Sequence, residues 1–238
     1  GSLNVEARDL TSLNLPLLTS VGGAMEVSGS NALTSFELPA LESVAAFGFH
    51  RNDALPILEL PSLASTGNMF IGQNSGLASV SVPALNSIGG ELGVEGNEAL
   101  ASASLPALVS LDRNLVVKNN TAMTSFALPV LPSVGRDLEV QRNISLTSVL
   151  LPTLAVVGND MKVWGNPTLT SLSLPTLGEV RGNLEIRGNV GLAQCLVDAL
   201  VEQLQANAGI GGTVATYGNN DDCTCEEVEG VVEATCPP

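Results

Sequence analysis

A repeating unit of 22 or 23 residues constrains the fold of this chain more than any other feature. Its last copy reads LTSLSLPTLGEVRGNLEIRGN (169–189). The proline of the unit recurs eight times at intervals of 22 or 23 residues, as Pro16, Pro39, Pro61, Pro83, Pro106, Pro129, Pro152 and Pro175. A near-constant interval of this length is the signature of a solenoid, in which each repeat packs on its neighbours.

Each unit divides into two short strands joined by two bends. In the last copy, Leu172 and Leu174 alternate with serines before Pro175, which is the period of a half-buried strand. Proline has no N–H to give to a sheet, so it ends this strand, and the bend that follows has room for a third short strand. Leu184 and Ile186 then alternate with charged residues in a second strand, with the leucine and isoleucine facing inward.

An asparagine closes the second strand in every copy. Stacked coils would bring these side chains about 4.8 Å apart, close enough for each amide to bond its neighbours and the backbone of the bend. The repeat therefore predicts a structural asparagine ladder formed by Asn31, Asn52, Asn74, Asn97, Asn120, Asn143, Asn166 and Asn189.

The open end of such a stack needs a cap, and the C-terminal region has the composition of one. Leu196, Leu200 and Leu204 recur every four residues, which predicts an amphipathic helix over about 193–207. A final strand is expected within 211–220, followed by an acidic tail. We therefore divide the chain into solenoid repeats over 1–192 and a cap over 193–238. At the other end, residues 3–10 resemble the second strand of a truncated coil.

All four cysteines lie after the last repeat, as Cys195, Cys223, Cys225 and Cys236. An even number confined to one segment favours two disulfides and an oxidising compartment, although the residues alone allow three pairings. Zinc is the competing interpretation, but the spacing between Cys223 and Cys225 is one residue short of the usual C-x-x-C. We expect neither a metal nor another cofactor.

Charge and hydropathy exclude several classes of partner. The formal net charge of −15 argues against nucleic acid and against anionic membrane surfaces. No apolar run reaches transmembrane length, so direct membrane insertion is not expected. The leading Gly1-Ser2 is typical of an expression scar, and we expect a secreted or cell-surface protein whose targeting or anchoring segments have been removed.

The order of strand, Leu-x-x-Val bend, Gly/Asn turn, Leu-x-Ile/Val strand and Gly-Asn ending resembles the receptor L domain over about residues 3–192. That family includes the ligand-binding domains of the insulin and epidermal growth factor receptors. Fungal GPI-anchored cell-wall proteins and secreted bacterial members are similar in keeping the L-T-S-x-x-L-P opening. The resemblance implies a mainly β, right-handed β-helix of about eight coils with leucine-rich-repeat character, and recognition of partners through an exposed sheet. It also implies that Cys195 pairs with Cys225, which leaves Cys223 for Cys236.

The outward positions of the second strand vary against the repeated background, and they are where we expect a partner to bind. They hold the only tryptophan, the only histidine and both lysines of the chain. Aromatic and basic residues on a flat sheet are typical interface anchors. The candidate partner-binding residues are Trp164, Lys162, Lys118, Arg187, Gln141, Phe70 and His50. Alternatively, Trp164 stacks on the stem of a neighbour, Phe70 lies under a loop, and the sheet is an ordinary solvated surface.

The sequence thus favours a non-enzymatic recognition module that binds a protein or a cell-surface glycan. His50 has no obvious nucleophile beside it, and no phosphate-binding glycine loop occurs, so an enzyme is not expected. A purely structural component of a wall or envelope is one alternative. Ice binding is another, because small hydroxyls recur four residues before the prolines, as Ser12, Ser35, Ser79, Ser102, Ser125, Ser148 and Ser171, with one interruption at Ile57.

Overall fold

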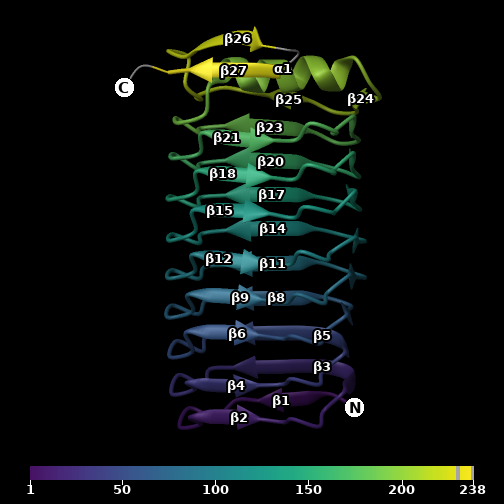
Figure 1. The fold of residues 1–238 in the computed structure, drawn as a ribbon, viewed down its shortest axis with the longest axis vertical. Helices are drawn as coiled ribbons and strands as arrows, with labels where there is room; N and C mark the ends of the chain where they lie inside the picture. Colours follow the sequence, from purple (N-terminus) through teal and green to yellow (C-terminus); the bar gives the residue numbers. More distant parts are fainter. Residues whose placement is uncertain (229–230, 237–238) are drawn as a thin grey trace.

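The computed structural model describes residues 1–228 and 231–236, and these form one column of stacked coils with a cap at the C-terminal end (Figure 1). The strands of successive coils pair in parallel, each coil lying directly above the one before it. The β-solenoid of about eight coils expected from the repeat is confirmed.

The strand before each proline forms one side of the column. Inter-coil pairing divides these three-residue strands into three small sheets of two, three and three strands. Their central residues, such as Leu58 and Val149, are fully buried, and the residues on either side face outward. The strands are β2 (Ser12–Asn14), β4 (Ser35–Glu37), β6 (Ile57–Glu59), β9 (Ser79–Ser81), β12 (Ser102–Ser104), β15 (Ser125–Ala127), β18 (Ser148–Leu150) and β21 (Ser171–Ser173).

From Pro61 onward, the bend after the proline contains the third short strand for which the repeat leaves room, and the cap adds one more such strand. Each of these strands has two residues, of which the second is buried in most coils. They are β7 (Ser65–Thr66), β10 (Ser87–Ile88), β13 (Ser110–Leu111), β16 (Ser133–Val134), β19 (Val156–Val157), β22 (Glu179–Val180) and β24 (Gly209–Ile210).

The second strand of each repeat forms a continuous parallel sheet along the whole column, which we call the long sheet. In the first coils the short strand and the second strand merge into one bent strand. The strands of the long sheet are β1 (Leu3–Val5), β3 (Ser20–Ser28), β5 (Ser43–His50), β8 (Met69–Gly72), β11 (Leu92–Glu95), β14 (Leu115–Lys118), β17 (Leu138–Gln141), β20 (Met161–Trp164), β23 (Leu184–Arg187) and β25 (Val214–Ala215). The pairing of Leu3 with Met25 confirms that the chain begins with part of a coil.

The core is a stack of aliphatic layers rather than a spherical cluster. Within one coil, Leu131, Val134, Leu138 and Val140 have no exposed surface. Each layer rests on an almost identical layer above and below, so burial depends on the stacking of coils and not on contacts within a single coil.

An asparagine ladder runs through the corner that follows the long sheet. In each rung, the backbone N–H of one asparagine donates to Oδ1 of the asparagine in the next coil, as from Asn120 to Asn143 over 3.0 Å. The Nδ2 group donates to a backbone carbonyl of the preceding coil, as from Asn143 to Val117 over 3.0 Å. The rungs are Asn52, Asn74, Asn97, Asn120, Asn143, Asn166, Asn189 and Asn219.

The prediction for the first rung is wrong. Asn31 is exposed, and the buried residue at this position is Ser30, whose backbone N–H donates to Oδ1 of Asn52 over 3.0 Å. The ladder residue directly follows the left-handed corner residue, which in this coil is Gly29 at a φ of 62°. Asn31 therefore lies one position too late to point inward.

The cap begins with α1 (Gln194–Gln205), within two residues of the predicted helix at each end. Val197, Leu200 and Leu204 are buried against the last layer, while Leu196 is only partly buried. The Nε2 group of Gln203 donates to the carbonyls of Leu174 and Leu177 over 3.1 and 2.8 Å, which satisfies backbone acceptors of the last complete coil.

Residues after the helix add a partial coil and a hairpin. Strands β24 and β25 pair with β22 and β23, so the sheets of the solenoid extend into the cap. An antiparallel hairpin of β26 (Thr224–Val228) and β27 (Val231–Thr235) lies at the end of the column (Figure 1). Disulfides join Cys195 to Cys225 and Cys223 to Cys236, which is the pairing that the resemblance implies.

Candidate functional site

The long sheet places all seven candidate partner-binding residues on its outer face, in two neighbouring files. Parallel pairing aligns Lys118 with Gln141, Gln141 with Trp164, and Trp164 with Arg187. In the second file, Phe70 lies beside Gly48 and Lys162 lies beside Glu139. His50 occupies the first file at the N-terminal end of this face. The alternation of inward and outward residues thus brings these side chains onto one surface.

Trp164 lies at the centre of a stack that we call the arginine–tryptophan ladder, formed by Arg142, Trp164, Arg187 and Tyr217. The guanidinium carbons of Arg142 and Arg187 lie 4.5 and 4.9 Å from the centroid of the Trp164 ring. Arg187 also lies 5.8 Å from the ring centroid of Tyr217. Since Arg142 comes from the coil before Trp164 and Arg187 from the coil after it, the indole has a cation over each face.

Sequence reasoning missed Arg142 and Tyr217, although both complete this ladder. Arg142 is not on the strand itself but in the corner after β17, and Tyr217 follows β25 in the cap. Their one sequence signal is position within the repeat: Arg142 follows the file residue Gln141, and Tyr217 precedes the glycine and asparagine that end the last coil.

The corner that holds Arg142 has a left-handed backbone in every coil from Gly29 onward. Glycine occupies it at Gly29, Gly96, Gly165, Gly188 and Gly218, with φ between 62° and 68°. The other coils place Arg51, Gln73, Asn119 and Arg142 there, at φ of 55°, 56°, 57° and 53°. A left-handed conformation is unfavourable for residues with a Cβ, so each of these four side chains is retained at some cost in stability.

Ion pairs hold most of the other charged side chains of this face. Lys118 Nζ lies 3.0 Å from Glu95 Oε2, and Lys162 Nζ lies 3.0 Å from Asp160 Oδ2 and 3.8 Å from Glu139 Oε1. Arg187 pairs with Glu185 on its own strand. Such partly exposed pairs contribute little to stability, but they fix the orientation of the side chains.

The electrostatics of Asp160 and Lys162 follow from this pairing. Asp160 Oδ1 accepts a hydrogen bond from the backbone N–H of Asn183 over 2.8 Å, and this bond, followed by the one from Lys162, lowers the pKa of the carboxyl group. In return, the hydrogen bond to Asp160 raises the pKa of Lys162. Both groups therefore stay charged near neutral pH.

The N-terminal part of the face is aromatic rather than cationic. The rings of His50 and Phe70 meet edge to face, with centroids 6.0 Å apart, and His50 also contacts the carboxylate of Glu26. Phe70 lies across the sheet itself and not under a loop: a Cβ built on Gly72 would lie 2.5 Å from its Cζ, and one on Gly93 would lie 3.0 Å from its Cδ2. The glycines therefore leave the space that the ring fills.

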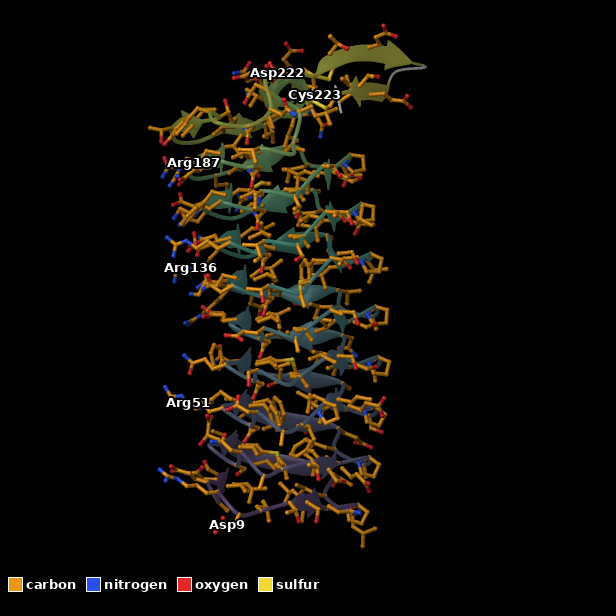
Figure 2. The ribbon with its side chains drawn as sticks, turned by 90° about the vertical axis from the view of Figure 1, so that its left-hand side faces the viewer. Asp9, Arg51, Arg136, Arg187, Asp222 and Cys223 are labelled. Atoms are coloured by element: carbon orange, nitrogen blue, oxygen red, sulfur yellow. A yellow bond between two sulfur atoms is a disulfide. The ribbon has the colours of Figure 1, made fainter. Side chains whose placement is uncertain are left out.

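The outer face differs in charge from the rest of the chain. Together with its left-handed corner, it carries five arginine or lysine residues, Arg51, Lys118, Arg142, Lys162 and Arg187, against four glutamates, Glu26, Glu95, Glu139 and Glu185. The whole chain has nine arginines and lysines against 24 acidic residues. Arg51, Arg136 and Arg187 project from the same side of the column (Figure 2). Basic side chains are thus concentrated on one side of an acidic protein.

A second polar ladder, which the sequence analysis missed, runs along the corner before the long sheet. The backbone N–H of Asp160 donates to Asp137 Oδ1 over 3.1 Å, and that of Thr213 donates to Asn183 Oδ1 over 2.8 Å. Asparagine, aspartate or glutamate recurs there at the repeat interval, which is the signal that identifies it. Its members are Asn68, Glu91, Asn114, Asp137, Asp160, Asn183 and Thr213.

Three exposed threonine hydroxyls beside the serine file bond neighbouring coils at the surface of the column. Thr34, Thr147 and Thr170 each donate through Oγ1 to a backbone carbonyl of the coil below, over 3.2, 2.9 and 3.2 Å. These groups satisfy the corners of neighbouring coils, so they are not a free array of donors. The ice-binding alternative rests on the serine file itself, and it stays a prediction.

In comparisons with known proteins, no protein-family model, no curated protein and no solved structure matches the chain. Among residues 1–228 and 231–236, no group of three or more histidine, cysteine, aspartate or glutamate side chains is arranged to hold a metal ion. In the same part of the chain, no helix has the length and apolar character needed to span a membrane. The resemblance to receptor L domains therefore stays a prediction.

Proposed function

We propose that this chain is a non-enzymatic extracellular recognition module that binds a protein partner through the outer face of the long sheet. The observation that supports this most is the placement of Trp164, His50, Phe70 and both lysines on one flat surface. Tryptophan, tyrosine and arginine are the residue types that dominate binding energy at protein interfaces.

The rigidity of the face favours binding. Parallel pairing holds its strands in register, the asparagine ladder fixes one corner, and ion pairs hold Lys118 and Lys162 in place. A surface that is ordered before binding loses little conformational entropy when a partner arrives. The face is therefore suited to specific recognition.

A protein is favoured over a neutral glycan because of the surroundings of Trp164. Sugars stack on an open aromatic face, whereas here a guanidinium group lies over each face of the indole. The groups of the arginine–tryptophan ladder that a partner can reach are the edge of the Trp164 ring and the N–H groups of the arginines. Those groups suit hydrogen-bond acceptors better than the apolar face of a sugar ring.

An extracellular or cell-surface location fits the two disulfides of the cap, because such bonds persist in oxidising compartments. Recognition of partners through an exposed sheet is also what the resemblance to receptor L domains implies. The identity of the partner is the part of the proposal that needs experiment.

The test is a capture experiment with immobilised protein and extracellular extracts. We expect Trp164→Ala and Lys162→Glu to abolish capture of a saturable partner while circular dichroism stays unchanged. Glu59→Lys is the matched control. Glu59 is exposed on β6, in the sheets formed by the strands before the prolines, and its substitution also changes the charge. Wild-type levels of capture by both face variants would disprove the role of this face. Absence of any saturable partner would instead favour a structural wall or envelope component.

A further inference from the structure

We infer that Arg142, held over Trp164, is the anchor of this face for a carboxylate group, and that the partner presents it on an acidic, extended protein segment. The inference rests on the proposed function and names the chemistry of the partner. Three observations on the arginine–tryptophan ladder support it: the backbone conformation of Arg142, the absence of an ion pair at Arg142 among the described residues, and the spacing between Arg142 and Arg187.

The backbone of Arg142 indicates a role other than stability. Its φ of 53° is one that glycine adopts without strain, and the corners of the next three coils have Gly165, Gly188 and Gly218. A strained residue that a glycine would relieve points to a functional reason for its side chain. Here the side chain reaches the outer face and covers the Trp164 ring.

The guanidinium group of Arg142 is also the cation of the arginine–tryptophan ladder whose N–H groups are free to bind a partner. Within the described residues it forms no ion pair and no side-chain hydrogen bond, while Arg187 pairs with Glu185. Arg113 and Arg136 are likewise unpaired among these residues, but neither stacks on an aromatic ring. Arg142 alone therefore combines a fixed position with free N–H donors. Carboxylates accept such a fork of donors through both oxygens.

The spacing of the ladder indicates the shape of the bound segment. Arg142 and Arg187 lie two coils apart, which is about 9.6 Å at the usual inter-strand distance. Residues three apart in a polyproline II helix lie on the same side and are separated by about 9.3 Å. Alternate residues of a β-strand are only about 6.8 Å apart. Two acidic residues in the pattern acid-x-x-acid therefore match both arginines when the segment runs along the column in the polyproline II conformation.

The overall acidity of the chain does not prevent this contact. Salt screens exposed charges over about 8 Å at physiological ionic strength, so the nearest groups dominate. Around the ladder, Glu185 balances the charge of Arg187, and Asp160 and Glu139 balance that of Lys162, so among the described residues Arg142 supplies the unpaired positive charge. Binding is expected to weaken as salt is added, because the attraction is electrostatic.

Trp164 is the only tryptophan of the chain, so its fluorescence reports on this site alone. The experiment titrates the intact protein with a (Glu-Pro-Pro)₄ peptide and with (Gln-Pro-Pro)₄ as the neutral control. We expect a saturable change in fluorescence with the acidic peptide only. Arg142→Gln is expected to weaken this binding about 10- to 100-fold, as for loss of a charge-assisted hydrogen bond. Arg142→Gly should weaken it as much, with an unfolding midpoint close to that of the wild type because glycine relieves the backbone.

Arg136→Gln is the matched control, since Arg136 is exposed, has no ion pair among the described residues and lies on the same side of the column (Figure 2). It should bind the acidic peptide like the wild type. Equal binding of both peptides, no saturable response, or wild-type affinity in Arg142→Gly would overturn the inference. If the inference fails in one of these ways but partner capture still depends on Trp164, the proposed function stands without the carboxylate anchor. If the acidic peptide binds through Arg142 but no partner is captured, the proposed function fails instead.

Discussion

The backbone N–H and the side-chain Nδ2 of Asn120 both donate to Oδ1 of Asn143 in the next coil, over 3.0 and 3.3 Å. Both residues are completely buried. One side chain thus satisfies a backbone donor and a side-chain donor of the coil below it while its own Nδ2 reaches a third group, the carbonyl of Val117. The ladder joins adjacent coils at a corner where water has no access.

Replacing Asn120 is therefore expected to be strongly destabilising. Asn120→Ala leaves the backbone N–H of Asn97 and the carbonyl of Val94 without their partners, since Asn120 supplies the acceptor for one and the donor for the other. Unsatisfied buried groups cost about 1–3 kcal/mol each, so we expect a loss of about 2–5 kcal/mol in the free energy of unfolding. Chemical denaturation followed by circular dichroism measures it.

Asn31→Ala is the control for this prediction. Asn31 is exposed and lies one residue beyond the ladder position, so its replacement should change stability by no more than about 0.5 kcal/mol. Equal effects of Asn31→Ala and Asn120→Ala would contradict the assignment of the rungs.

The left-handed corner gives a second prediction. At Gly165, an added Cβ would meet only Arg142, with Cγ at 3.6 Å and N at 3.9 Å, so the space is sufficient and the φ of 67° is the obstacle. Gly165→Ala should lower stability by about 1–2 kcal/mol. Gly22→Ala, where the added carbon meets nothing within 4 Å and the φ is not left-handed, should change it far less. If Gly165→Ala is as stable as the wild type, the backbone at this corner must change its conformation to accommodate the alanine, which would contradict the prediction.

The pairing of Asp160 predicts a dependence of stability on pH. Because the pKa of Asp160 is lower in the folded chain than its ordinary value of 3.8, the carboxylate stabilises the fold above that pH. This contribution is lost as the pH falls through the folded pKa. For Lys162 the pKa is raised above 10.5, so its contribution is complete below that pH and is lost at higher alkalinity.

Denaturation of Asp160→Asn between pH 6 and pH 2 tests this. The variant should lose less stability than the wild type across the acidic range, because its amide still accepts from Asn183 but no longer titrates. Lys162→Met should remove part of the same pH dependence, since it takes away the second cause of the shift. A wild-type acid profile in Asp160→Asn would rule out this carboxylate as a contributor.

The cap supplies a further prediction through its disulfides. The bond between Cys195 and Cys225 joins two residues 30 apart in the sequence, the first of which lies in the first turn of α1. The helix shields the last layer through Val197, Leu200 and Leu204. The double variant Cys195→Ala/Cys225→Ala should lose about 3–4 kcal/mol on the chain-entropy estimate. We expect the loss to begin at the C-terminal coils, with faster hydrogen exchange at β23 than at β14. Uniform exchange along the column would contradict a capping role.

Much of the fold could be predicted because each coil meets nearly the same surroundings as the next. The alternation around Pro175 and over Leu184–Arg187 predicts the strands, and the 22- or 23-residue interval predicts which residues face each other in neighbouring coils. That is why the two outward files containing Lys162 and Trp164 were predictable. The helix could also be predicted, because Leu200 and Leu204 must cover a layer that has no coil above it.

The errors and omissions lie at the corners. Asn31 follows the left-handed residue by two positions and Ser30 by one, a difference that decides which of them points inward. Ser30 precedes Asn52 by 22 residues, an interval that the repeat allows, whereas Asn31 precedes it by one residue fewer. The repeat interval therefore gave a weak signal in favour of Ser30. Neither Arg142 nor Tyr217 belongs to an alternating strand, and no period of two predicts where their side chains lie.

The amino-acid sequence by itself determined the stack of coils, its inward leucine layers, most of its asparagine ladder and the residues that point outward from the long sheet. These follow from periodicity, which acts locally and is repeated in every coil. Only the tertiary structure decided which side chains touch across coils: the two arginines over Trp164, Phe70 across its glycines, and Asp160 between Asn183 and Lys162. The reason is that such contacts depend on corner geometry and on side-chain direction in three coils at once, neither of which the pattern of a single repeat specifies.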